Sequence, residues 1–77
     1  MKQLYLYLHI PTQPVLSLAE EWHKIAVIDT CYTALMADIV EQFRLGDEKR
    51  GISGNRQLIL VTAGDEESAL EIAKTKL

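Results

Sequence analysis

Hydrophobic residues alternate with polar or aromatic ones near the start of the chain, over residues 3–10. Successive side chains of a strand point to opposite faces, so the alternation predicts a strand with two different sides. The aliphatic side consists of Leu4, Leu6, Leu8 and Ile10, and the other side consists of Tyr5, Tyr7 and His9. We expect the aliphatic side to pack on a core. The second side could meet water, a ligand, a nucleic-acid base or another protein, but because only two helices are predicted to cover both faces of the sheet, we expect the last helix or a partner subunit to bury it.

Apolar residues then recur at spacings of three and four, which is the pattern of an amphipathic helix. The stripe consists of Leu18, Trp22, Ile25, Tyr32, Met36, Ile39 and Phe43. Ser17 and Glu20 have the spacing of a capping box, which predicts that the helix begins at Leu18. Gly46 is the predicted end, because glycine readily adopts the left-handed conformation that follows a helix.

Residues 24–29 allow a second interpretation of this region. They are rich in β-branched side chains, and Val27 and Cys31 fall outside the helical stripe. A short apolar run of this kind can also be a buried strand, because periodicity alone does not separate the two. One long helix and a strand over residues 24–29 are therefore both open.

The second half of the chain predicts a loop, a strand and a helix. Residues 47–55 are charged and contain two glycines, as in a solvated loop. Residues 57–62 are apolar on both faces, which is typical of an inner strand of a parallel sheet. A turn at residues 63–65 leads into a helix whose acidic start suits the helix dipole. Its expected inward-facing residues are Ala69, Leu70, Ala73 and Leu77.

These elements predict a single α/β domain over residues 1–77, a two-layer βαβα unit with a short parallel sheet. If residues 24–29 form a strand, the unit becomes a three-stranded βαβαβα arrangement. Two strands leave unpaired backbone groups at both edges and are rarely stable alone. We therefore expect dimerisation, or another protein partner, to complete the sheet.

Composition limits the partners further. The chain is 48% hydrophobic and 25% charged, as in folded globular proteins. Its net charge of −3 disfavours RNA, because no overall positive field attracts a phosphate backbone. The single cysteine, Cys31, has no partner for an internal disulfide and is expected to be a small core residue in a cytoplasmic protein. No metal motif, cofactor motif or membrane-spanning run is evident.

Two side chains are candidates for chemistry from their positions alone. Asp29 is the one acid within the apolar stripe, and a buried carboxylate often marks a functional site. His9 lies at the end of the first strand, where open α/β sheets place ligands. Each also has a plain structural interpretation, as a hydrogen-bonded or packed residue.

A basic cluster surrounds the predicted glycine-containing loop. It consists of Arg44, Lys49, Arg50 and Arg56. Together with Tyr5 and Tyr7, these residues could hold RNA by charge and stacking. The alternative is an ordinary solvated loop.

Four segments carry a resemblance to a known family. They are the Trp-His-Lys-Ile-Ala-Val run at residues 22–27, the Tyr-Thr-Ala-Leu run at 32–35, the apolar run at 58–61 and the acidic start of the last helix at 65–67. In this order they resemble the fold of the archaeal and eukaryotic-type peptidyl-tRNA hydrolases and its uncharacterised relatives. The resemblance implies an α/β fold and places Lys24 at an active-site position.

Other positions depart from the family's pattern. His23 stands before Lys24 where the hydrolases have glycine, and Ile28 and Cys31 occupy positions of their glutamine and histidine. The chain also ends before the family's last two strands and the acidic, threonine-containing motif that they bring. These departures make hydrolysis doubtful and indicate a scaffold without a complete catalytic site.

Three functions follow as hypotheses. The preferred one is a protein-interaction or oligomerisation module that is not an enzyme. The second is an ester hydrolase of the peptidyl-tRNA type that uses Lys24, with Asp29 and His9 as further catalytic candidates. The third is an RNA-binding module that uses the basic cluster and the two tyrosines.

Overall fold

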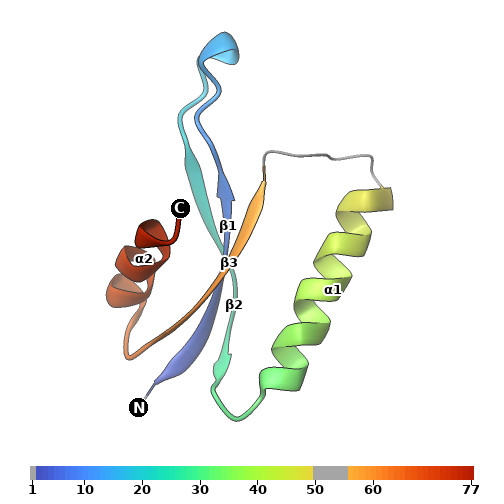
Figure 1. The fold of residues 1–77 in the computed structure, drawn as a ribbon, viewed down its shortest axis with the longest axis vertical. Helices are drawn as coiled ribbons and strands as arrows, with labels where there is room; N and C mark the ends of the chain where they lie inside the picture. The colour runs from blue at the N-terminus through green and yellow to red at the C-terminus, as the bar shows by residue number, and fades with distance from the viewer. Residues whose placement is uncertain (1, 50–55) are drawn as a thin grey trace.

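A central strand with a neighbour on each side organises the fold. The computed structural model describes residues 2–49 and 56–77. The elements in chain order are β1 (Gln3–Ile10), the short 3₁₀ helix η1 (Pro14–Leu16), β2 (Glu21–Asp29), α1 (Thr33–Lys49), β3 (Gln57–Ala63) and α2 (Glu66–Thr75). The strand order is β2-β1-β3, and β1 is antiparallel to both neighbours. The two helices lie on opposite sides of this sheet (Figure 1).

The aliphatic side of β1 packs beneath α1. Leu4, Leu6 and Met36 are the buried residues of this cluster, and Leu6 and Met36 are each only 1% exposed. The half-buried residues around them are Ile25, Ala26, Ile28, Ile39, Val40 and Leu58. The alternation at the start of the chain therefore predicted both the strand and its core side correctly.

The aromatic side of β1 is also buried, beneath α2. Tyr5 and Tyr7 are 4% and 3% exposed, and Ala69 and Ala73 of α2 are fully buried against the same cluster. Small side chains on the helix let it approach the sheet closely enough to cover the tyrosine rings. Asp65 begins α2 as its N-cap, because its carboxylate accepts a hydrogen bond from the backbone N–H of Ser68 at 2.7 Å. The predicted turn and final helix are thus confirmed.

The long helix expected from residue 18 to residue 46 is wrong, and the strand interpretation of residues 24–29 is confirmed within β2. A β-bulge explains the misleading pattern. Leu6 pairs with Ala26 and Tyr7 pairs with Lys24, so Ile25 is an extra residue in β2. The extra residue breaks the period-two alternation and leaves apolar spacings that imitate a helix.

The connection before β2 also differs from its prediction. Ser17 is not the start of a helix; it has a left-handed backbone with φ of 55° and ends η1. Residues 10–20 form the end of a hairpin that projects beyond the rest of the molecule (Figure 1). The helix that does form begins at Thr33 and continues through Gly46 to Lys49. A single glycine costs a helix only about 1 kcal/mol relative to alanine, so it did not end this one.

The α/β class is confirmed, whereas the parallel sheet is wrong. Both strand pairs are antiparallel, and the inner strand is β1 rather than β3. Although β3 is apolar on both faces, it is an edge strand of the sheet. One of its faces is only partly covered, since Leu60 remains 44% exposed. Two further predictions fail: Cys31 is exposed in the turn after β2, and Leu77 is 57% exposed after the end of α2.

Candidate functional site

A histidine, a glutamate and a tryptophan meet where the hairpin joins the sheet. His9 is 7% exposed, and its Nε2 lies 2.8 Å from Oε2 of Glu20. The Trp22 ring lies against His9, with 4.5 Å between the ring centroids and a tilt of 43°. The register explains the contact, because His9 is directly opposite Trp22 in the β1–β2 pair. His9 was a sequence candidate, whereas Glu20 was expected only as part of a helix cap.

The pKa of Glu20 is held below its usual value of 4.5, chiefly by the hydrogen bond with His9. The Trp22 indole lowers the pKa of Glu20 further, although its Nε1 makes no hydrogen bond of standard geometry. Charge interactions with His9 and Lys74 also lower the pKa of Glu20, whereas desolvation opposes the shift. This arrangement fixes a charged carboxylate at the base of the hairpin. The pair joins the end of β1 to the residue before β2, so it ties together the two sides of the hairpin.

We expect the Glu20 contact to make folding stability depend on pH. Because the folded pKa lies below 4.5, Glu20 stabilises the fold above that pH and loses its contribution as pH falls through the folded pKa. Glu20→Gln should therefore lower the urea midpoint at neutral pH and make little difference in acid. Glu21→Gln is the control. Glu21 follows Glu20 directly, as the first residue of β2, but its carboxylate lies 3.7 Å from the exposed side chain of His23 and does not contact His9. An equal acid dependence in wild type and Glu20→Gln would contradict this prediction.

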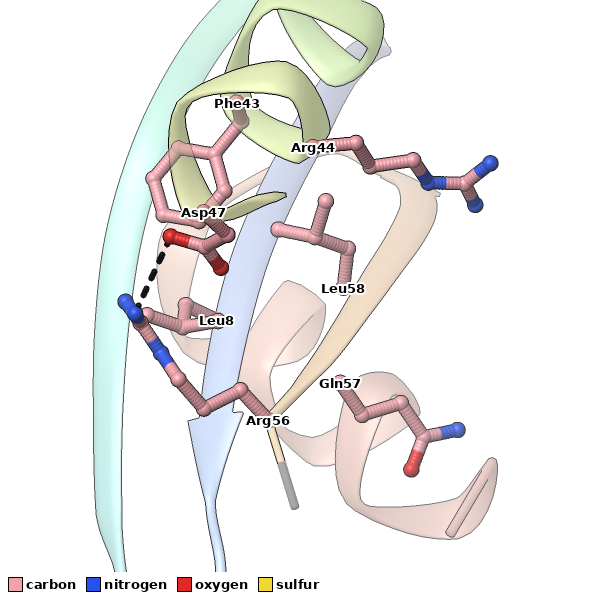
Figure 2. Close-up of a pocket in the computed structure, with 7 residues that line it drawn as sticks. All are labelled: Leu8, Phe43, Arg44, Asp47, Arg56, Gln57 and Leu58. Carbon is pink, nitrogen blue, oxygen red and sulfur yellow. Dashed lines mark hydrogen bonds and ion pairs between the residues drawn. The ribbon is translucent and has the colours of Figure 1, made fainter. Parts of the chain in front are cut away.

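A pocket with a volume of about 480 Å³ lies on the α1 side of the sheet. Its lining consists of Leu8, Phe43, Arg44, Asp47, Arg56, Gln57 and Leu58 (Figure 2). Arg56 donates from Nη1 to Oδ1 of Asp47 at 3.1 Å, and its guanidinium lies 5.5 Å from the centre of the Phe43 ring. The Asp47 carboxylate balances the charge of Arg56, so this cation is already engaged within the chain.

The described residues of the predicted RNA surface do not come together. Arg44 is exposed and points away from the Asp47–Arg56 pair (Figure 2). Tyr5 and Tyr7 lie on the opposite side of the sheet and are buried by α2. The side chain of Lys49, like the whole of Arg50, lies outside the described part of the structure. The RNA hypothesis thus lacks its stacking rings.

Asp29 lies far from the other two catalytic candidates, His9 and Lys24. Asp29 is exposed and pairs with Gln3, whereas His9 is six residues further along β1, roughly 20 Å away. Lys24 forms an ion pair of 3.0 Å with Glu66 of α2. Asp29 lies at the end of β2, and its carboxylate accepts a long hydrogen bond of 3.4 Å from the side chain of Gln3. Lys24 is opposite Tyr7, two residues before His9, but among the described residues no hydrogen bond or ion pair joins any two of the three candidates.

The described residues contain neither a metal-binding cluster nor a membrane-spanning helix. Within residues 2–49 and 56–77, no group of three or more histidine, cysteine, aspartate or glutamate side chains is placed to hold a metal ion. No helix in these two segments has both the length and the apolar character needed to span a membrane.

The free edge of β3 is the remaining candidate for binding. β3 is the last strand of its sheet, and no other described backbone group forms a hydrogen bond with its outer side. The seven residues from Gln57 to Ala63 include no charge and no proline. Open sheet edges were expected from the sequence, but β3 was predicted to be the inner strand, so its free edge was not identified.

Comparison of the chain with protein-family models, curated proteins and solved structures found no match. The resemblance to the peptidyl-tRNA hydrolases therefore stays a prediction from sequence. The geometry of the chain itself is what supports a function.

Proposed function

We propose that this chain is a protein-interaction module that binds an extended strand of its partner along the free edge of β3. In this mode of recognition, main-chain hydrogen bonds supply affinity and side chains on alternate positions supply specificity. The observation that carries the proposal is the uncharged, unbulged edge of β3 with Leu60 44% exposed at its centre.

The contrast between the two edges of the sheet supports this assignment. Natural sheets protect their edges against strand pairing with charged side chains and bulges. β2 has both, since it contains Glu21, Lys24 and Asp29 and carries the bulge at Ile25. β3 has neither in its seven residues. The protection is confined to one edge, which leaves the other suited to a partner.

The surface around Leu60 adds to the support. Leu60 pairs with Leu6 across β1–β3 and so lies on the side of the sheet that carries α1. Leu58 on the same side is half-buried against the α1 cluster, whereas Leu60 and Thr62 are exposed. The cover provided by α1 therefore ends before the β3 edge. An added strand would shield Leu60 from water.

Selection from a displayed library of random peptides tests the proposal. We expect the wild-type chain to select extended apolar peptides, and Leu60→Lys to weaken their binding by at least about tenfold, because the charge would lie beside the added strand. Amide chemical-shift changes on peptide addition should concentrate in β3.

Leu35→Lys is the matched control, because Leu35 is 49% exposed but lies on α1. It should leave peptide binding unchanged. Failure to select any peptide, or selection of peptides that bind Leu60→Lys as well as wild type, would contradict the proposal.

A further inference from the structure

We infer that the strand received by β3 is β3 of a second copy of this chain, antiparallel about a two-fold axis at Leu60. This inference rests on the proposed function and names its partner. A two-fold axis places the same patch of both copies in contact, so the patch must be complementary to itself. The sequence of β3 meets this condition.

The register about Leu60 gives only uncharged neighbours. Leu60 lies opposite its own copy, and the other opposed pairs are Leu58 with Thr62, Ile59 with Val61, and Gln57 with Ala63. Each pair joins residues of the same side of the sheet, because the paired numbers are both even or both odd. Ile59, Val61 and Ala63 already belong to the buried α2 side, so that layer would continue across the axis.

The ends of the paired strands are complementary in charge. The same register places Arg56 of one copy beside Gly64 of the other, next to Asp65 at the start of α2. Arg56, which already pairs with Asp47 of its own chain, would therefore lie near the acidic start of α2 of the other copy at both ends of the interface. This local complementarity acts against the general repulsion between two chains of charge −3.

Antiparallel pairing of two copies through β2 is unfavourable. A two-fold axis at Ile25, the middle of β2, would put Glu21 opposite Asp29 at both ends, and like charges directly opposite are destabilising. The extra residue at the bulge would also interrupt the new pairing. Self-association through the sheet is therefore specific to the β3 edge.

One exposed residue of α2 extends the interface. Glu66 of α2 reaches Lys24 of β2, and Leu70 one turn later is half-buried on the same flank of the helix. Ile72 is on the other flank by helical geometry, toward β3, and is 38% exposed. Joining two sheets at β3 would bring the two α2 helices side by side with Ile72 between them.

Sedimentation equilibrium of the full chain tests the inference. The mass should rise with concentration from 8.7 kDa toward twice that value. Leu60→Lys should raise the dissociation constant by at least about tenfold, while Leu35→Lys leaves it unchanged. A mass that stays at 8.7 kDa at every concentration, or association retained by Leu60→Lys, would overturn the inference.

Cysteine cross-linking tests the register independently of these variants. In a Cys31→Ser background, Leu60→Cys should form a disulfide with its own copy, because directly opposed residues have Cβ atoms close enough to bridge. Thr62→Cys should not, since two copies of residue 62 would be roughly 13 Å apart. Equal cross-linking of both variants, or of neither, would overturn the register.

Peptide selection separates this inference from the proposed function. Peptides that bind through Leu60 while the wild-type chain stays monomeric would refute the second copy and leave strand addition at β3 intact. Loss of self-association on Val15→Lys but not on Leu60→Lys would place the contact at the hairpin tip, where Val15 is 96% exposed, and would also refute the inference.

Discussion

Leu6→Ala should lower the free energy of unfolding by about 3–5 kcal/mol, the largest effect expected of a single substitution on the α1 side of the sheet. Leu6 is 1% exposed on the central strand and packs with Leu4 and Met36. A chain of this length has a total stability of about 4–12 kcal/mol, so the variant should be largely unfolded at moderate temperature. Urea denaturation followed by circular dichroism measures the change.

Leu60→Ala is the informative control, because Leu60 lies directly opposite Leu6 on β3. At a concentration where the chain is monomeric, it should cost only about 1 kcal/mol, since Leu60 is 44% exposed. Equal losses in the two variants would contradict the central position of β1 and favour β3 as the inner strand.

Tyr7→Ala should cost about 3–5 kcal/mol, because it removes a buried ring from the α2 side. Tyr7 is 3% exposed, stacks with Tyr5 at 6.3 Å between centroids and meets the Trp22 ring edge-on at 6.3 Å. Burial raises the pKa of Tyr7, as do the nearby Glu66 and Tyr5. The ring therefore stabilises the attachment of α2 rather than offering a surface for a base.

Tyr7→Phe separates the ring from its hydroxyl. The hydroxyl donates only a long hydrogen bond, 3.4 Å, to the backbone carbonyl of Glu66, so its removal should cost at most about 1 kcal/mol in urea denaturation. A loss in Tyr7→Phe as large as that in Tyr7→Ala would show that the hydroxyl, not ring packing, carries the contribution.

The sequence predicted those elements whose own periodicity is uninterrupted. The alternation of residues 3–10 identified β1, and the acidic cap at Asp65 with the small residues Ala69 and Ala73 identified α2. β2 was ambiguous because the bulge at Ile25 shifts its alternation by one residue. A bulge depends on pairing with another strand, so no local pattern in β2 could show it.

Strand order could not be derived from local patterns either. Apolar residues on both faces of β3 suggested an inner strand, but the two faces of β3 have different surroundings. Ile59 and Val61 contact the α2 cluster, whereas Leu60 on the other side is left uncovered. Only the positions of the helices distinguish a covered face from an exposed one.

The candidate site was predicted least well. His9 was identified as a notable residue, but its partner Glu20 lies on the far side of the hairpin and was assigned to a helix cap. Tyr5 and Tyr7 were grouped with the basic cluster as one surface, although the sheet separates them from Arg44 and Arg56. Side-chain chemistry could be read from the sequence, whereas the grouping required the strand register.

Residue-specific amide hydrogen exchange of β3 tests the central claim, that its outer edge is free to accept a strand, most directly. In dilute solution, amides that face β1 should be protected and the alternate amides that face outward should exchange rapidly. As the chain is concentrated, the outward-facing amides should become protected in wild type but not in Leu60→Lys. Protection of all β3 amides in both wild type and Leu60→Lys, even in dilute solution, would contradict the central claim. Half-protection that is the same at every concentration would refute only the pairing with a second copy.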